Sequence, residues 1–415
     1  MKQMAALRGV LTDEEQDLIC PIRYLHNPLQ SSAPYLYQTH LSFPSTYLNF
    51  RNLNDPTFST FSTLEGSIPY CSSIPAAYES KYWRESIEAA RTFVHLLATD
   101  KDMADIEIRD GLTLRKIAQH ELRPGFKHRC MRATAYMYPF CVEPRKLEIL
   151  AVLMVMQFLF DEDKCEGADE KQVPVLVADF LRRLEDPAVT VNKSRTALQA
   201  YLDSIISDIH GGGGETGNGG AEVYLEMRKT FTYLRPRAPI TSIGDYLEFR
   251  RENVSAGFVF AGIKFSLASN VDIHQPLLER FMTWAADHLA ITNDLYSYAK
   301  EMRAFRNGTC PDLINIVAIL EKLLSLPNQS SALEITYALL LQREQWMFEE
   351  LKKFEASGCL DEGTWMFLRG VWACLSGNTL YSMTCERYGG EAARIAENRD
   401  FVPPVNGPPD MGKRP

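Results

Sequence analysis

The stretch LLERFMTWAADHLAITNDLYSYAKE, Leu277–Glu301, decides how the chain can fold. Its first part is largely apolar at helical spacing, which is typical of a helix buried in a protein body. Its end carries an amide, a hydroxyl and a carboxylate at Asn293, Ser297 and Glu301. Residues four positions apart lie close together on an α-helix, so these three side chains fall within about 80° of one another. The stretch therefore predicts a buried helix that ends in a polar face.

The same helical texture continues on both sides of this stretch. A first helix is expected in YESKYWRESIEAARTFVHLLA, Tyr78–Ala98. Further helical patterns cover 144–162, 172–185, 192–209, 242–269, 275–306, 311–326, 331–357 and 362–388. No alternating strand pattern separates them, so we predict an all-α fold of roughly ten or more helices.

The domain boundaries follow changes in composition. Residues 1–75 are rich in aromatic, Ser, Thr and Pro residues and predict an irregular segment that packs on the core. Residues 76–400 are expected to form one large domain, interrupted by a glycine-rich loop at 211–220. A phosphate-binding loop would need a following GK[ST] and a preceding strand, so we interpret this loop as flexible. The tail, 401–415, is expected to be disordered.

Composition limits the partners and the compartment. A net charge of −9 over 415 residues argues against nucleic acid and anionic membranes as partners, although local arginines or metal ions can still bind an anionic substrate. The nine cysteines form no CxxC pair, which favours reduced thiols. The longest apolar run, Leu147–Phe160, is too short to span a bilayer. We therefore expect a cytoplasmic protein, monomer or homodimer, without stable membrane insertion.

A second acidic cluster ends the apolar run. The stretch FLFDEDKCE, Phe158–Glu166, places Asp161, Glu162, Asp163 and Glu166 at the C-terminal end of the predicted helix. Acids there oppose the helix dipole, and a divalent cation would offset that penalty. Helices of a bundle can bring two such ends together around metal ions. The alternative for each cluster taken alone is a solvated polar helix end.

Basic residues that could meet an anion lie elsewhere in the chain. YLEFRRENVSAG contains Arg250 and Arg251, and Arg387–Tyr388 lies near the end of the last predicted helix. Arginine forks suit phosphate recognition. Each of these residues taken alone is most often a surface arginine.

With these motifs the chain resembles the class I terpene cyclases of fungi and bacteria. Asn293 and Asp294, followed by Ser297 and Glu301, match that family's second metal motif in full, including Lys300 just before the glutamate. The resemblance covers roughly residues 76–390 with the order of motifs intact. It implies that the domain is catalytic, a class I terpene synthase helical bundle around a central active-site cavity.

The other motifs of the family are also present in order. Asp161 matches the first residue of the aspartate-rich motif, and Arg250 matches the diphosphate sensor. WACLSGNTLYSMTCERY, Trp372–Tyr388, resembles the C-terminal signature, with Tyr381 where the family usually has Trp. The aspartate-rich motif itself departs from the family pattern. Its fifth position is Cys165, and the acid comes one residue later at Glu166, about 100° further around a helix.

The resemblance implies a reaction and a set of ligands. Three magnesium ions would bind between the two motifs, and a diphosphate substrate would be ionised and its hydrocarbon chain cyclised. The implied metal ligands are Asp161, Glu162, Glu166, Asn293, Ser297 and Glu301. The implied diphosphate contacts are Arg250, Lys300, Arg387 and Tyr388. The aromatic candidates for the pocket are Phe158, Phe160, Phe258, Tyr298 and Trp372, for each of which core packing is the alternative.

The implied substrate is farnesyl diphosphate, and the implied product is a cyclic sesquiterpene hydrocarbon. The long N-terminal segment and the shifted acid resemble humulene synthases of fungal tropolone–sesquiterpenoid pathways. Two alternatives stay open. One is a chain-elongating prenyltransferase of the same fold, and the other is a non-catalytic helical protein with degenerate metal sites, which Cys165 favours.

Overall fold

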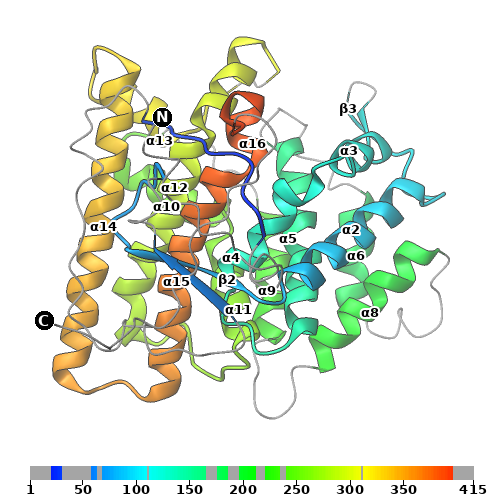
Figure 1. The fold of residues 1–415 in the computed structure, drawn as a ribbon, viewed down its shortest axis with the longest axis horizontal. Coiled ribbons are helices and arrows are strands. Elements are labelled where there is room, and N and C mark those ends of the chain that lie inside the picture. The colour runs from blue at the N-terminus through cyan, green and yellow to red at the C-terminus, as the bar shows by residue number, and fades with distance from the viewer. Residues whose placement is uncertain are drawn as a thin grey trace, which may run out of the picture.

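Helices make up most of the described chain, as the apolar spacing of the sequence predicts (Figure 1). The computed structural model describes residues 20–29, 58–62, 68–109, 112–164, 175–185, 196–211, 220–233, 240–309 and 312–395, with the backbone alone for residues 61–62, 108–109, 160–164 and 175–176. The α-helices are α2 (Trp83–Thr99), α3 (Leu114–Glu121), α4 (Ala133–Met137), α5 (Pro144–Lys164), α6 (Val175–Glu185), α8 (Ala197–Gly211), α9 (Gly220–Thr232), α10 (Ile243–Asn253), α11 (Ala256–Ser266), α12 (Glu279–Arg306), α13 (Ile316–Leu323), α14 (Gln329–Ser357), α15 (Glu362–Thr384) and α16 (Glu386–Gly389). Single 3-10 turns are η5 (Phe126–His128), η6 (Cys130–Arg132), η7 (Pro276–Leu278) and η8 (Gly390–Ala393). The all-α prediction is confirmed.

Helix α12 lies near the middle of the body, with α14 along one side and α15 along another (Figure 1). Most apolar residues in its middle are buried, among them Leu289, Ile291 and Leu295, each at most 2% exposed. Full burial of such a side chain contributes about 1.5–3 kcal/mol relative to exposure. This packing fixes the helix that carries the predicted polar face.

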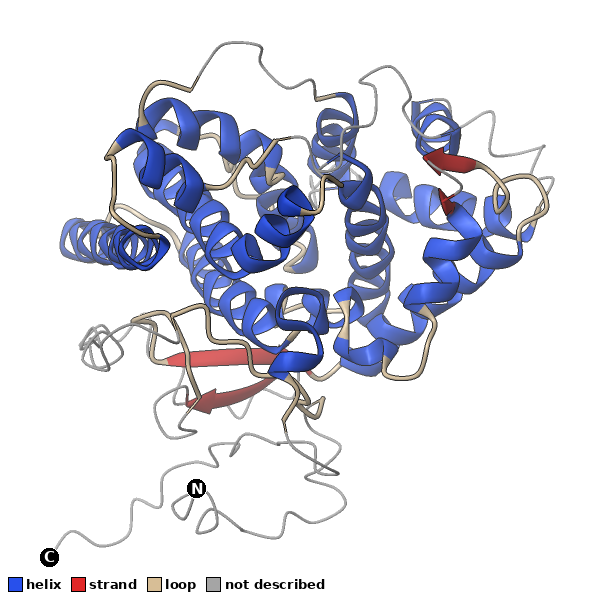
Figure 2. Cartoon of the chain, turned by 90° about the horizontal axis from the view of Figure 1, so that it is seen from above, coloured by secondary structure: helices blue, strands red, loops and turns tan. Residues whose placement is uncertain are grey.

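Two short pairs of strands accompany the helices, so the expectation of no strands is wrong at these places. Strand β1 (Phe58–Ser62) pairs antiparallel with β2 (Ala76–Ser80), and β3 (Glu107–Arg109) pairs with β4 (Leu112–Thr113). Seen from above, both pairs lie at the margin of the helical body (Figure 2). The rings of Phe58 and Tyr78 pack on Phe140 at centroid distances of 4.6 and 5.4 Å. Tertiary packing of this kind stabilises strands that are too short to show a pattern.

The described part of the N-terminal segment contacts the C-terminal end of the fold. The backbone N–H groups of Leu25 and His26 donate to the carbonyls of Ala393 and Met383, at 2.8 and 2.7 Å. Tyr24 forms an isolated bridge with Arg394. Residues 20–29 therefore run beside the segment that follows α15.

Two details of the helices go beyond the apolar spacing. The pattern over 242–269 is continuous, whereas the chain forms α10 and α11 with a break at Val254–Ser255, in the segment Val254–Gly257 where the family resemblance implies a broken helix. Helix α9 follows the glycine-rich loop and lies outside every predicted helix, because the glycines before Ala221 hide the start of its apolar spacing. Residues 212–219 of that loop and the tail 401–415 lie outside the described residues.

Two further observations concern expectations from composition. None of the helices in the described ranges combines the length and the hydropathy that crossing a bilayer requires. The seven cysteines within those ranges are all free thiols.

Candidate active site

One cavity of about 110 Å³ lies among α5, α10, α11, α12 and α15. Its apolar lining includes Met154, Phe158, Val259 and Leu289. Polar side chains from α10, α12 and α16 reach the same space. A concave, largely apolar site with a few convergent polar groups is the usual form of a small-molecule pocket.

The predicted polar face of α12 meets this cavity. Asn293 and Glu301 line it, and Ser297 is buried between them on the same helix face. Lys300 is half-buried and does not line the cavity. The i, i+4, i+8 spacing thus brings the amide, the hydroxyl and the carboxylate to one place, as predicted.

Asp294 turns away from the cavity and organises the helices behind it. Its buried carboxylate accepts hydrogen bonds from the Tyr246 hydroxyl, from Nε of Arg250 at 2.9 Å and from the Ile316 N–H at 3.0 Å. Nη2 of Arg250 lies 2.8 Å from the same carboxylate in an ion pair. The Ile316 N–H is the first N–H of α13, where a negative charge is stabilised by the helix dipole. One carboxylate therefore joins α10, α12 and α13.

Arg250 is held on α10 with its guanidinium against α12. Helix α10 begins at Ser242, whose hydroxyl accepts from the Asp245 N–H at 3.0 Å. Burial by itself favours neutral Arg250, but the charge of Asp294 raises the pKa of Arg250 well above its ordinary value. The guanidinium is therefore always charged and fixed in direction.

The guanidinium of Arg250 also extends the polar cluster along the cavity wall. Nη2 donates to Oδ1 of Asn293 at 2.8 Å, and Nη1 donates to Oδ1 of Asn253. The amide nitrogen of Asn293 in turn donates to the Tyr388 hydroxyl at 3.1 Å. Arg250, Asn253, Asn293 and Tyr388 all line the cavity, so residues that are far apart in the sequence form one connected polar patch.

The α12 face has the donor chemistry of a site for a hard cation. Asn293, Ser297 and Glu301 offer amide, hydroxyl and carboxylate oxygens, which magnesium prefers. Burial and the nearby charge of Asp294 raise the pKa of Glu301. Asn315 donates to Oε2 of Glu301 at 2.9 Å and to the Asp294 carbonyl at 2.9 Å. A buried carboxylate of this kind, with a neutral amide as its close donor, gains stability from a bound cation, so these residues fit a divalent metal.

A search for clusters of His, Cys, Asp and Glu alone would not find the polar face of α12. Within the described ranges, no group of three or more His, Cys, Asp and Glu side chains is placed to hold a metal ion. The α12 set does not form such a group because two of its three members are Asn293 and Ser297.

Arg387, on α16, lies beside the cavity and contacts a residue of its lining. Its guanidinium lies 5.5 Å from the ring centre of Phe158, a cavity-lining residue of α5. That ring lies 5.7 Å from the ring of Tyr381, which packs on Tyr388 at 6.0 Å. The C-terminal signature is thereby brought against the helix that ends in the acidic motif.

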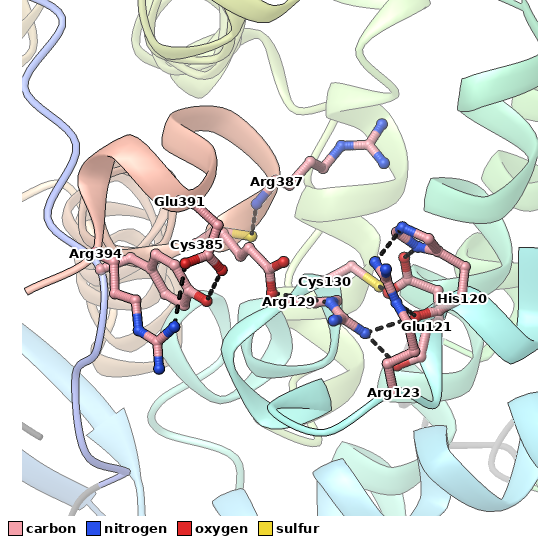
Figure 3. A network of polar contacts seen from close by, with 11 residues as sticks. His120, Glu121, Arg123, Arg129, Cys130, Cys385, Arg387, Glu391 and Arg394 are labelled. Atoms are coloured by element: carbon pink, nitrogen blue, oxygen red, sulfur yellow. Dashed lines mark hydrogen bonds and ion pairs between the residues drawn. The ribbon is translucent and has the colours of Figure 1, made fainter. Parts of the chain in front are cut away.

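A polar network behind α16 holds Arg387 in this position (Figure 3). Arg129 donates to Oε2 of Glu386 at 3.0 Å and, through Nη1, to the carbonyls of His120 and Glu121 at 2.7 and 2.9 Å. These carbonyls end helix α3, where a cation is favourable. Arg387 itself extends away from the network in Figure 3. Arg129 therefore anchors the residue next to Arg387 to the end of α3.

The break between α10 and α11 also reaches the cavity. Val254 and Ser255 line it, and Ser255 adopts a left-handed conformation with φ of 60°. Such a conformation is uncommon for a residue with a side chain. A Cβ atom at Gly257 would collide with the carboxylate of Glu226 on α9. Gly257 thus leaves room for the Glu226 carboxylate next to the break, and the break places irregular backbone beside the site.

Several predicted aromatic residues lie in the core instead of the cavity. Trp372 is 2% exposed and does not line the cavity, although the sequence predicts a substrate contact. Phe258 and Tyr298 are equally buried and also do not line it. Apolar residues occur on more than one side of their helices, so the sequence pattern could not tell a core-facing ring from a cavity-facing one. Phe158 is the predicted ring that does line the cavity, and the side chain of Phe160 is not described.

The acidic motif can be placed only by its backbone. Asp161 and Glu162 lie in the last turn of α5, a few residues beyond Gln157 and Phe158, which line the cavity. Their side chains are not described, and Glu166 and Cys165 lie outside the described residues. Their part in metal binding stays a prediction.

Several residues of the site carry little or no signal in the sequence. Asp294 belongs to the second metal motif, but its position there does not reveal its function. The predicted site does not include Asn253, Asn315 and Asn378. Asn315 precedes the apolar stretch IVAIL and accepts from the Val317 N–H at 3.0 Å, so its helix-capping position was a usable signal. Asn253 and Asn378 carry no such signal.

Comparison with known proteins agrees with this site. Residues 224–343 match the family model "Terpene synthase family 2, C-terminal metal binding". This range contains Arg250 and the whole polar face of α12. The family description supports dependence on a divalent metal.

Similar sequences come from fungi. Terpene cyclase 6 of Gibberella fujikuroi is 24% identical over 384 residues, which cover 90% of this chain and 97% of that protein. Aristolochene synthase of Aspergillus terreus is 26% identical over 275 residues, which cover 62% of this chain and 79% of that protein.

Solved structures show the same fold at low identity. A single-residue variant of cucumene synthase superimposes with a TM-score of 0.52 at 17% identity, covering 73% of this chain and 96% of its own. An α-eudesmol synthase superimposes with a TM-score of 0.51 at 16% identity, covering 72% and 95%. The fold is that of solved terpene synthases, and the match of residues 224–343 together with the similar fungal sequences supports an enzyme of the terpene cyclase type.

Proposed function

We propose that this enzyme converts farnesyl diphosphate, with magnesium, into a cyclic sesquiterpene hydrocarbon and diphosphate. One observation carries the proposal. The connected polar patch of Arg250, Asn293 and Tyr388 lies in the wall of a cavity whose remaining described lining is mostly apolar. A substrate with a charged diphosphate and a long hydrocarbon chain matches both kinds of surface.

The oxygens of α12 are the first part of the proposed metal site. Asn293, Ser297 and Glu301 would hold magnesium on one side, and Asp161, Glu162 and Glu166 would complete a site for three ions on the other. Bound magnesium would supply Lewis-acid stabilisation of the negative charge that develops on the departing diphosphate. Replacement of the usual fifth-position acid by Cys165 leaves Asp161 as the main ligand from α5 unless Glu166 turns inward.

The chain's own cations orient the diphosphate. Arg250 is already held by Asp294, so little reorganisation is needed when its remaining N–H groups meet a phosphate oxygen. Arg387, whose guanidinium lies over Phe158, and the Tyr388 hydroxyl would contact the same group. Lys300 is proposed as a further contact because it precedes Glu301 on α12.

The apolar lining acts after the diphosphate leaves. It excludes water from the allylic cation and confines the chain to a folded shape in which ring closure competes with escape. The faces of Phe158 and Tyr381 offer negative quadrupoles to the positive charge. Loss of a proton from the cyclised cation then gives a hydrocarbon. A ring system of the humulene type is the first product to test, because the resemblance in the sequence favours it.

Two other functions make different predictions. A chain-elongating prenyltransferase would release a longer linear diphosphate, and Asn293 and Ser297 in place of a second aspartate-rich motif argue against it. A non-catalytic protein would release nothing. We also propose that the enzyme works in the cytoplasm as a monomer or homodimer.

The test is a product assay with purified protein. Farnesyl diphosphate is incubated with and without magnesium, and the organic extract is analysed by gas chromatography and mass spectrometry. A magnesium-dependent cyclic fifteen-carbon hydrocarbon supports the proposal. A product only from the ten- or twenty-carbon diphosphate would correct the substrate, a longer linear diphosphate would favour the prenyltransferase, and silence with all three would refute catalysis.

A further inference from the structure

Asn378 is a polar residue of the cavity wall that the diphosphate site does not use. It lies on α15, lines the cavity and is only 8% exposed. Arg250, Asn253 and Asn293 in the same wall are hydrogen-bonded to one another. The side-chain amide of Asn378, in contrast, makes no hydrogen bond with any group in the part of the chain that the structure describes.

Tyr381 lies three residues further on and lines the same cavity. Residues three apart on a helix share a face, so its side chain neighbours that of Asn378. The hydroxyl of Tyr381 is fully covered and has the thiol of Cys385 as its neighbour. Among the described residues, Asn378 is therefore the group of this face of α15 that lines the cavity with a polar side chain and no protein partner.

Unpaired buried polar groups are rare, because they destabilise a folded protein. An apolar side chain of similar shape would fill this position without that penalty. Ser376, on the same helix, shows the usual solution, since its hydroxyl donates to the Ala373 carbonyl at 3.1 Å. The amide at 378 thus indicates contact with something that enters the cavity.

The chemistry of the site points to a positive charge. If the proposed function is right, the cavity holds a carbocation after the diphosphate leaves, and this inference rests on that function. The amide oxygen carries partial negative charge, and its effect on a cation is strong where water is excluded. The metal-binding face belongs to α12, whereas Asn378 and Tyr381 belong to α15.

We propose that Asn378, with Tyr381 beside it, is a specificity-determining residue that draws the positive charge of the cyclising cation toward α15. The position of the charge decides which carbon closes the ring and which proton is lost. Asn378 therefore acts on the choice of product, whereas Arg250 and the α12 oxygens act on ionisation.

The variant that tests this is Asn378→Leu, which keeps the approximate shape and removes the oxygen. Each protein is incubated with farnesyl diphosphate and magnesium, products are quantified by mass spectrometry, and diphosphate release is measured separately. We expect the ratio of the main product to the next product to change about tenfold, equivalent to ~1.4 kcal/mol. Tyr381→Phe should shift the ratio in the same direction by a smaller factor. Ser376→Ala is the matched control on α15 and should leave the ratio unchanged.

The outcomes separate the two proposals. Asn378→Asp keeps an oxygen at the same place and should keep the main product, whereas Asn378→Leu should not. If only the volume of the side chain mattered, the two variants, which are of similar size, would change the product ratio alike. An unchanged ratio within about twofold in a folded Asn378→Leu protein would overturn the inference while the proposed function stood. If Asn378→Leu does not fold, Tyr381→Phe decides, and an unchanged ratio there overturns the inference. Absence of any terpene from the unaltered enzyme would overturn both.

Discussion

The site should depend strongly on Asp294, a residue that contacts no predicted metal or substrate. Its carboxylate is fully buried and accepts from Arg250, Tyr246 and the Ile316 N–H. Asp294→Asn keeps the size of the side chain and removes its charge. Oδ1 of the new amide can still accept from Arg250, but the NH2 group then faces the Ile316 N–H, donor against donor.

The magnitude follows from these contacts. Removing one partner of a buried ion pair costs about 3–5 kcal/mol. The retained contact with Arg250 reduces that loss of stability. The two N–H donors that face each other at Ile316 increase the loss again by about 1–3 kcal/mol. We therefore expect a loss of about 3–5 kcal/mol in the free energy of unfolding. For a chain of this size this lowers Tm by roughly 3–6 °C. Arg250 also loses its fixed direction, so kcat/KM should fall at least about 100-fold.

The assay compares Asp294→Asn with Asp208→Asn by thermal unfolding and by diphosphate release. Asp208 pairs with Arg145 at 2.6 Å, but their side chains are 43% and 39% exposed. A surface pair of that kind contributes about 0–1 kcal/mol, so Tm should move by about 2 °C or less. If Asp294→Asn were as stable and as active as Asp208→Asn, the assigned function of the Asp294 contacts would be wrong.

Three other predictions address separate parts of the molecule. The double replacement Asn293→Ala with Ser297→Ala should abolish diphosphate release while Tm stays within about 3 °C, since two neutral side chains are lost from a cavity wall; an active, folded double variant would remove the metal assignment. Arg129→Met should raise KM for the diphosphate more than it lowers kcat, because α16 loses its anchor to α3 and Arg387 becomes misplaced; equal effects on both constants would contradict this. Burial raises the pKa of Glu79 to about 7 from its ordinary 4.5, against the lowering effect of Arg132, so the stability it adds is complete below about pH 4.5 and is lost as pH rises through 7. As the pH rises from about 5 to about 8, the free energy of unfolding of Glu79→Gln should therefore increase relative to that of the unaltered protein by up to about 3 kcal/mol, as measured by thermal unfolding. A difference between the two proteins that stays constant over this pH range would show that Glu79 does not titrate there.

The helical fold and half of the metal site could be predicted, because both depend on local periodicity. Spacing by four along α12 places Asn293, Ser297 and Glu301 on one face whatever the tertiary structure. Asp294 follows Asn293 directly, and one residue turns it about 100° from that face, toward α10 and α13. What it meets there depends on helix packing, which the local pattern does not contain.

Other features required long-range information. The apolar pattern is continuous from α10 into α11, so the spacing alone does not indicate the break; the family resemblance implies it at Val254–Gly257, and the structure shows it by the positive φ of Ser255. Strands β1 and β2 are stabilised by Phe140, which is distant in the sequence, and not by alternation within themselves. Trp372 and Phe158 both fitted a pocket-lining pattern, and only the packing of their helices distinguishes them.

The measurement that tests the central claim most directly is calorimetric titration with an unreactive farnesyl thiodiphosphate. The central claim is that the α12 oxygens bind metal, and that the metal and Arg250 together bind the diphosphate. The titration is done on the unaltered enzyme and on the double variant of Asn293 and Ser297, with magnesium and with a chelator. We predict tight binding only with magnesium, and at least about 100-fold weaker binding by the folded double variant. Equal affinity with and without magnesium, or equal affinity of both proteins, would contradict the claim.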